Sequence, residues 1–292
     1  MHYTGPIYRH PLEADTPIVE ISYGCSWNKC NFCNMYKIKF GASPEEHIVE
    51  DLEELSSYYP KTLSRIIVAN GNPLALSTKR LLKVSELIQK YFPEINTISC
   101  QSSIRNLMHK SQDEIDQLAE AKYNDIYIGL ESGLPPVLKQ MNKGYTQEQE
   151  YETLKKLKNA GIRYIALLMG GVGGYDYSNE HVIETAKLLN TYPPKMVSII
   201  TTGIVSGTKL DEMAKNGEFK QLCDKDVILE EMELIEKLNL PDNTYFFGHH
   251  NNNLAPVSGY FSDKEELISD FEYKLREIPQ NVLESKIKRE YL

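Results

Sequence analysis

Three cysteines stand close together near the start of the chain, in a pattern suited to binding a metal centre. Cys25, Cys30 and Cys33 have the spacing C-x4-C-x2-C and follow a short apolar run. Cysteine thiolates are soft ligands that bind iron–sulfur clusters, zinc or Cu(I). An iron–sulfur cluster held by only three thiolates would leave one iron open, and a substrate or cofactor can coordinate an open iron.

Two other interpretations of the cysteines compete with the iron–sulfur cluster. A structural zinc site has four closed ligands. The remaining cysteines, Cys100 and Cys223, lie far away without ligand spacing, although a histidine could be the fourth ligand. A redox pair made of Cys30 and Cys33 would leave Cys25 without a role. The pattern therefore favours the iron–sulfur cluster.

The cysteine segment resembles the radical S-adenosylmethionine superfamily, whose usual spacing is C-x3-C-x2-C with an aromatic residue before the last cysteine. Phe32 holds the aromatic place, and the first spacing is one residue longer, as in some branches of the superfamily. Residues 25–37 are similar to small radical proteins that are often described as related to oxygen-independent coproporphyrinogen oxidase. The resemblance implies a [4Fe–4S] cluster on Cys25, Cys30 and Cys33, with S-adenosylmethionine on the open iron.

Three further segments carry the resemblance, each at the end of a predicted strand. Residues 70–73, Asn-Gly-Asn-Pro, stand where the family binds the methionine amino group; its usual acidic residue is absent, so backbone carbonyls or Asn72 would serve. Residues 128–133 resemble the Gly-x-Glu-Ser segment of the family, and residues 169–174 stand where the family packs backbone against adenine. Tyr36 follows the cysteines closely enough to touch adenine. The resemblance implies these cofactor contacts: Phe32, Tyr36, Asn70, Gly71, Asn72, Glu131, Gly170 and Gly171.

Two of these assignments have a structural alternative. Glu131 could cap the next helix, but Gly129 and Gly133 on either side permit close backbone approach and favour contact with a cofactor. The segment 170–174 could be only a flexible turn. Four glycines within these five residues at a strand end favour close approach to a ligand.

The resemblance implies an enzyme that cleaves S-adenosylmethionine reductively and abstracts hydrogen from an unidentified small-molecule or peptide substrate. It also implies an electron donor such as flavodoxin or ferredoxin, and leaves open whether the enzyme is an oxidoreductase or a transferase. The competing hypothesis is a zinc-stabilised binding protein without catalysis. No residue is assigned a catalytic role. His249 and His250 could begin a polar loop or exchange protons at the substrate end.

Composition restricts the partners and the compartment. The 292 residues include 32 Lys or Arg and 41 Asp or Glu, a formal net charge of −9. Nucleic acid is thus an unfavoured partner, because phosphate binding needs a positive surface. No apolar run approaches the roughly 18 residues that span a bilayer. Without a signal-peptide pattern at the N-terminus we expect a cytoplasmic protein, in which thiols stay reduced.

Apolar runs alternate with amphipathic segments along the chain, which favours an α/β fold with a parallel sheet. With the resemblance, this alternation predicts a partial (β/α)6 TIM-like barrel over residues 1–207 and a C-terminal helical extension over 208–292 that packs on the barrel. Ligands bind at the carboxyl ends of such strands. The expected strands are residues 18–23, 65–70, 97–102, 125–131, 164–169 and 196–202, with a late apolar run at 244–247.

Capping boxes mark three helix starts, at Ser43, Ser111 and Thr146. Further helices are expected after Ser178 and over residues 226–238 and 262–275. Of the remaining polar groups, Arg105 is either solvated or paired with a carboxylate. We expect Cys100 inside a buried strand and Cys223 on or near a helix.

Overall fold

The computed structural model describes residues 1–286 and divides the chain into two compact units. The first unit comprises Met1–Asn28, Tyr36–Gly129 and Glu152–Tyr164. The second comprises Lys29–Met35, Leu130–Tyr151 and the chain from Ile165 onward. Among the described residues, no helix has the length and apolar character required to cross a membrane.

Parallel strands form the centre of the first unit. They lie in the order β1-β4-β5-β6, and Val19 of β1 is opposite Val68 of β4. Their interior residues are almost all buried, as expected for a sheet covered on both faces. The bounds are β1 Ile18–Glu20, β4 Arg65–Ala69, β5 Thr97–Ser102 and β6 Tyr123–Glu131, the end of which belongs to the second unit.

The run at residues 18–23, predicted as one strand, is in fact two. β1 pairs with β4, whereas β2 (Ser22–Tyr23) forms a small antiparallel pair with β3 (Gly41–Ala42). Ile21 lies between them, and its carbonyl accepts a hydrogen bond from Ser43 N at 3.1 Å. The chain therefore changes its pairing partner at Ile21, which alternation of apolar residues does not reveal.

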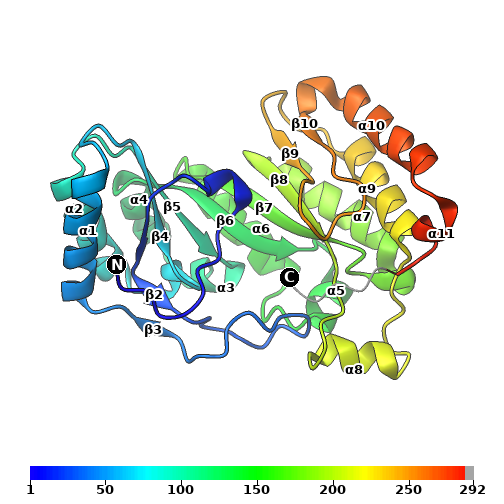
Figure 1. Cartoon of the computed structure of the whole chain (residues 1–292), viewed down its shortest axis with the longest axis horizontal. Helices are drawn as coiled ribbons and strands as arrows, with labels where there is room; N and C mark the ends of the chain where they lie inside the picture. The colour runs from blue at the N-terminus through cyan, green and yellow to red at the C-terminus, as the bar shows by residue number, and fades with distance from the viewer. Residues whose placement is uncertain (287–292) are drawn as a thin grey trace. The chain divides into compact units, whose positions relative to one another are not determined.

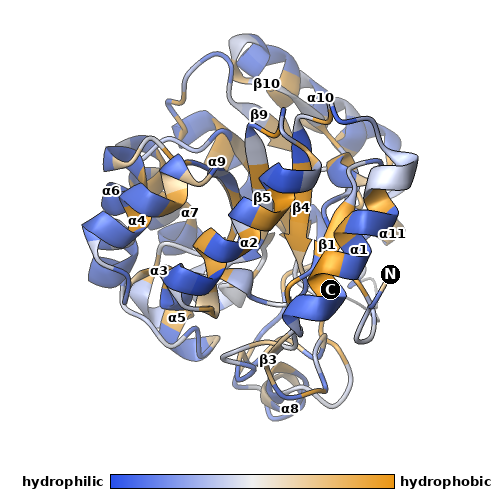
Figure 2. Cartoon of the chain, turned by 90° about the vertical axis from the view of Figure 1, so that its left-hand side faces the viewer, coloured by the Kyte–Doolittle hydropathy of each residue, from blue (hydrophilic) through white to orange (hydrophobic). Residues whose placement is uncertain are grey.

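Amphipathic helices flank the strands of the first unit. Figure 2 shows β1 and β4 mainly in the colour of hydrophobic residues, and α1 and α2 with both hydrophobic and hydrophilic faces. The buried side chains of α1 recur at helical spacing, at Ile48, Leu52 and Leu55. The helices are α1 Glu45–Tyr58, α2 Thr78–Tyr91, α3 Ile104–Leu107, α4 Gln112–Glu120 and α6 Gln147–Asn159, which carries residues of both units.

The second unit also combines strands and helices. Strands β7, β8 and β9 are parallel, and β10 is antiparallel to β9. Helix α9 packs against both α7 and α10, and the three helices lie side by side in Figure 1. The elements are β7 Arg163–Gly170, whose first two residues belong to the first unit, β8 Met196–Thr201, β9 Tyr245–Phe247, β10 Ser258–Tyr260, α5 Pro135–Gln140, α7 Gly174–Thr191, α8 Lys209–Lys215, α9 Asp224–Lys237, α10 Lys264–Glu277 and α11 Gln280–Leu283.

Local sequence signals identify most helix starts. The capping boxes at Ser111 and Thr146 are confirmed, each with reciprocal hydrogen bonds to the residue three positions on. The box at Ser43 is wrong, because Pro44 occupies the N-cap and Ser43 Oγ instead donates to Glu20 at 3.4 Å. Helix α2 was not among the predicted helices, although Ser77 caps its N-terminus.

A buried ion-pair network holds the first unit together at the start of β4. Arg65 Nη1 lies 2.6 Å from Asp125 Oδ2, and its Nε donates to Glu13 Oε2 at 3.0 Å. Arg163 pairs with the other oxygen of Asp125 at 2.8 Å. Burial alone would raise the pKa of Glu13, but hydrogen bonds and charge from Arg65 hold it below its usual value. Both carboxylates therefore pair with Arg65, and Asp125 pairs with Arg163 as well.

Replacing Arg65 by Met should leave Glu13 charged and buried without its cation. Removing one partner of a buried pair costs about 3–5 kcal/mol, so the urea midpoint of R65M should fall well below that of the wild type. K83M is the control, because Lys83 pairs with Glu86 on the surface at 3.9 Å. Equal midpoints for R65M and K83M would show that the network contributes little.

Candidate functional site

Cys25 begins a tightly turned loop in the first unit. It follows Gly24, which has a φ of +70°, and its Sγ accepts a hydrogen bond from Asn28 N at 3.3 Å. Asn28 also has a positive φ, of +48°, and its side chain donates to Tyr36 O at 2.8 Å. These contacts hold the Cys25 thiol in a defined position after β2.

Helix α3 and the β4 turn tether this loop. Ser26 N donates to Asn72 Oδ1 at 3.0 Å, and Asn106 Nδ2 donates to Ser26 Oγ at 2.9 Å. The Arg105 guanidinium lies over the Trp27 ring, 4.0 Å from its centroid, a cation–π arrangement. Asn72 and Arg105, two residues singled out in the sequence, thus position the segment that carries Cys25.

The Asn70–Gly71 turn presses against the start of the cysteine loop. A Cβ on Gly71, whose φ is +68°, would lie 1.8 Å from the Gly24 carbonyl oxygen. Asn70 Oδ1 accepts hydrogen bonds from Gly71 N at 2.8 Å and from the Tyr36 hydroxyl at 2.9 Å. Only glycine fits at position 71, because both the space and the backbone conformation exclude a side chain.

Cys30 and Cys33 lie in the second unit beside an apolar cluster. Cys33 N donates to Cys30 O at 3.2 Å, closing a turn between them. Phe32 lies between the two cysteines in the sequence. Its side chain is buried and packs in a cluster with Met141, Met169 and other residues. The structure therefore places Phe32 in the core beside the cysteine turn.

A buried charged group lies at the end of β6. Glu131 adopts a φ of +62°, and its Oε1 lies 2.5 Å from Lys143 Nζ. The two side chains are 12% and 5% exposed, respectively. Burial would lower the pKa of Lys143, but the charges of Glu131 and Cys30 raise it above its usual value. Lys143 is thus a buried group whose charged form is favoured by Glu131 and Cys30.

Glu150 is a further buried carboxyl in this group. It is fully buried, and among residues 1–286 neither of its oxygens has a hydrogen-bond partner. Burial raises its pKa well above the usual value, although Lys143 opposes the shift. Burial therefore favours the neutral form of Glu150, and the ion pair with Lys143 is formed by Glu131.

The glycine turn after β7 lies against α9. A Cβ on Gly170 would stand 2.8 Å from Glu231 Oε1, and one on Gly174 would stand 2.7 Å from Lys220 O. Gly171, at a φ of +73°, donates its N–H to Glu230 Oε1 at 2.6 Å. Close packing on the chain's own elements thus accounts for three of these glycines.

Glu230 belongs to a buried polar chain with His181 and Ser132. Ser132 Oγ lies 2.7 Å from His181 Nδ1, and His181 Nε2 lies 3.9 Å from Glu230 Oε1. Burial lowers the pKa of His181 to about 4. Burial also raises the pKa of Glu230 to about 7, against the hydrogen bonds from Ser178 and Gly171. Burial thus favours the neutral form of both groups.

The remaining predicted residues lie in ordinary structural settings. His249 Nδ1 is 2.6 Å from Ser258 Oγ, and His250 Nδ1 accepts from Asn252 N at 3.2 Å. Cys100 is buried in β5, and Cys223 is the N-cap residue of α9, as expected. Burial lowers the pKa of His250.

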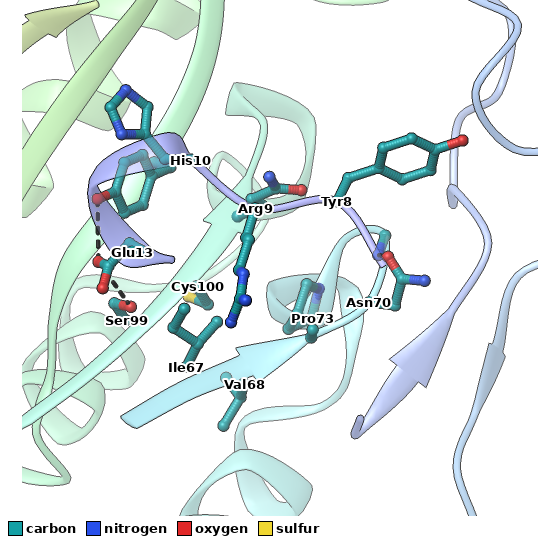
Figure 3. Close-up of a pocket in the computed structure, with 14 residues that line it drawn as sticks. Tyr8, Arg9, His10, Glu13, Ile67, Val68, Asn70, Pro73, Ser99 and Cys100 are labelled. Atoms are coloured by element: carbon teal, nitrogen blue, oxygen red, sulfur yellow. Dashed lines mark hydrogen bonds between the residues drawn. The ribbon is translucent and has the colours of Figure 1, made fainter. Parts of the chain in front are cut away.

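The first unit also contains a cavity, shown in Figure 3. It lies between the N-terminal segment and strands β4, β5 and β6, and it reaches the Asn70–Gly71 turn. None of the residues on its N-terminal side stands in a recognisable sequence motif. They follow no strand, and a cavity forms only when distant segments pack. The N-terminal contributors are Tyr8, Arg9, His10 and Glu13.

The cysteines expected to bind a metal centre are identified by their spacing in the sequence. All five cysteines lie among the described residues, and none is in a disulfide. Over residues 1–286, no group of three or more His, Cys, Asp or Glu side chains is arranged to hold a metal ion. Nothing in this geometry supports a closed structural zinc site, which needs four converging ligands.

Comparison with known proteins decides the family. The model of the radical SAM superfamily matches residues 19–189, more than half of the chain. The chain belongs to the radical SAM superfamily. Members of this superfamily use a [4Fe–4S] cluster and S-adenosylmethionine, so the predicted cofactors and the α/β partial-barrel fold class are confirmed.

Individual relatives of this radical SAM protein are distant. The chain is 25% identical to the heme chaperone HemW of Lactococcus lactis over 47% of this chain and 36% of the relative. It is 24% identical to the tRNA-2-methylthio-N(6)-dimethylallyladenosine synthase of Fusobacterium nucleatum over 80% of this chain and 54% of the relative. The chain thus spans about a third to a half of the length of these relatives.

A solved structure shows the same fold. Methylornithine synthase superposes with a TM-score of 0.55 at 16% identity, covering 78% of this chain and 64% of that one. At this identity the likeness concerns the fold alone. The family model therefore shows the superfamily, and the solved structure shows the fold.

The pH dependence of stability tests the buried position of Glu230. A carboxyl with a raised folded-state pKa stabilises fully below its unfolded pKa of 4.5 and loses that contribution as the pH rises to about 7. This loss is about 3 kcal/mol. His181 acts in the opposite sense, losing stability as the pH falls from 6.5 to about 4.

Both wild type and Glu230→Gln contain His181. The difference between their free energies of unfolding therefore cancels the contribution of His181. Gln keeps an acceptor for Gly171 N, so the wild-type advantage should decline by about 3 kcal/mol between pH 4.5 and 7. Chemical denaturation at several pH values measures it. E233Q on the same helix, where Glu233 is 40% exposed, should show little change. A difference independent of pH for E230Q would contradict the assignment.

Proposed function

We propose that this chain is a radical SAM enzyme that holds a [4Fe–4S] cluster through Cys25, Cys30 and Cys33. The carrying observation is the C-x4-C-x2-C spacing, which lies within the residues that match the superfamily. Thiolates suit such a cluster, and three of them leave one iron open. When bound, the cluster supplies the electron that cleaves S-adenosylmethionine to a radical able to remove hydrogen from a small-molecule or peptide substrate.

The residues around the cysteines fit this group. Lys143 is buried and cationic, and its charge acts on Cys30. A buried cation offsets the negative charge of thiolates and of the cluster they hold. Phe32 and the apolar side chains that pack with it lie against Cys30 and Cys33, which are partly buried. The charge and the apolar character of these surroundings therefore support a cluster of this kind.

The proposed cofactor contacts use strand ends. The Asn70–Gly71 turn, with Asn72 beside it, would receive the methionine end of S-adenosylmethionine, and Tyr36 would touch the adenine. Glu131 would hydrogen-bond a ribose hydroxyl or the methionyl ammonium. Gly170 and Gly171 would present backbone to the adenine.

Three further assignments are part of the proposal. Electrons would come from a donor such as flavodoxin or ferredoxin. Residues 1–207 would form the radical core, and the segment from residue 208 onward would be an extension packed on it. Whether the reaction is an oxidation or a transfer follows from the substrate, which the proposal leaves open.

Loss of cluster ligands should abolish iron binding. Replacing Cys25, Cys30 or Cys33 by Ala should eliminate stoichiometric iron after anaerobic reconstitution, together with the brown colour. Cys223→Ala is the matched control, because this thiol donates to Asp226 at 3.2 Å, at the start of α9. Iron analysis and absorption spectra measure the result. Full iron content in any ligand variant would remove that cysteine from the set.

Glu131→Gln tests the cofactor contact on β6. An ionised acceptor makes a hydrogen bond roughly twice as strong as a neutral one, so affinity for S-adenosylmethionine should fall about tenfold. Iron content should remain, because Glu131 is not a proposed ligand. Equilibrium binding without reductant measures the change, with the exposed Glu148→Gln as control. Unchanged affinity at full iron content would leave Glu131 only its structural pairing with Lys143.

A further inference from the structure

The cavity of the first unit has two different kinds of wall. One wall is the N-terminal segment, with Tyr8, Arg9 and His10. The other consists of residues of β4, β5 and β6, including Ile67, Gln101 and Tyr127. Figure 3 shows the Arg9 side chain extending from the N-terminal segment toward β4. A charged side chain thus faces a mainly apolar strand surface.

The acidic group of this cavity is already neutralised. Glu13 is 3% exposed and accepts hydrogen bonds from Arg65, from the Tyr127 hydroxyl at 2.9 Å and from Ser99 Oγ at 3.3 Å. Arg65 and Arg163 likewise match the charge of Asp125. These pairs leave no net negative charge to attract a cationic ligand.

Arg9 lines the cavity and is itself an exposed residue. Its one hydrogen bond in residues 1–286 runs from Nη1 to Thr16 O at 3.2 Å, and in this part of the chain no carboxylate forms an ion pair with it. A guanidinium presents five N–H donors in a planar fork that matches a carboxylate. Arg9 therefore retains donors that can face an anionic ligand.

A second polar group lies on the opposite wall. Gln101 of β5 is half-buried, and its carboxamide has no hydrogen bond within the described residues. Ile67, Ala69 and Pro73 contribute apolar surface between these polar groups. A ligand pocket commonly combines such apolar surface with a few polar groups that fix orientation.

We propose that this cavity binds the carboxylate of a small organic acid substrate, through the Arg9 guanidinium and with Gln101 as a second polar contact. The inference rests on the proposed function, because the cavity reaches the Asn70–Gly71 turn assigned to S-adenosylmethionine. The aliphatic part of the acid packs on Ile67 and Pro73. The N-terminal segment is thus a specificity-determining wall of the active site.

Binding of a simple carboxylate tests the proposal without knowledge of the substrate. Butyrate and its neutral analogue butyramide are titrated into the reconstituted protein, with and without S-adenosylmethionine and without reductant, and followed by ligand-observed NMR. R9Q is compared with R276Q, which removes the same charge from an exposed arginine on α10. Thermal melting verifies that both variants fold.

The expected result is specific to charge and position. R9Q should weaken butyrate binding at least tenfold, because a charge-assisted bidentate contact is lost, while R276Q changes it less than twofold. Butyramide should bind wild type and R9Q equally. Gln101→Leu should weaken butyrate binding to a smaller extent than R9Q.

Two outcomes would overturn the proposal. Equal butyrate affinity for R9Q and R276Q would show that Arg9 does not bind the acid. A tenfold loss of S-adenosylmethionine affinity in R9Q, with butyrate excluded whenever S-adenosylmethionine is bound, would assign the carboxylate to the cofactor. Failure of the wild type to retain iron or bind S-adenosylmethionine would instead contradict the proposed function. The titration of butyrate alone would still test whether Arg9 binds a carboxylate.

Discussion

The missing side chain at Gly71 is the constraint on which the candidate site of the first unit depends. Because a Cβ there would overlap the Gly24 carbonyl oxygen, the end of β4 can lie directly against the residue before Cys25. Asn70 and Tyr36 then join this contact through side-chain hydrogen bonds. The position of the first cysteine is therefore set by the β4 turn as much as by its own strand.

The second unit meets a different requirement, the stabilisation of a buried cation. Lys143 lies almost out of solvent, and a lone ammonium there would lose most of its hydration. The unusual backbone of Glu131 brings a carboxylate within 2.5 Å. A left-handed conformation in a non-glycine residue is unfavourable, so the ion pair offsets part of its cost. This arrangement places a defined positive charge near Cys30.

The chain of Ser132, His181 and Glu230 shows the opposite solution, since burial favours its neutral state. Hydrogen bonds join Ser132 to His181 of α7 and Glu230 of α9 to the Gly171 amide, and His181 Nε2 lies 3.9 Å from Glu230 Oε1. A neutral buried network avoids the desolvation penalty that charged groups incur. The glycine turn proposed to contact adenine is thus hydrogen-bonded to this network, whose groups are uncharged at mildly acidic pH.

The sequence by itself determined the features that local chemistry decides. The cysteine spacing, the alternation of strands and helices and the capping boxes at Ser111 and Thr146 all depend on residues close in the chain. The family resemblance rests on the same local segments. These signals sufficed to predict the fold class, the superfamily and the cofactors.

Only the tertiary structure decided what distant segments do to one another. Ser43 does not cap α1, and its hydroxyl donates instead to Glu20 at the end of β1. Glu150 looks like an ordinary acidic residue in the first turn of a helix, yet packing buries it completely. The cavity at Arg9 exists only because the N-terminal segment lies over three strands. Burial and partner choice depend on contacts far apart in sequence, and local pattern carries no record of them.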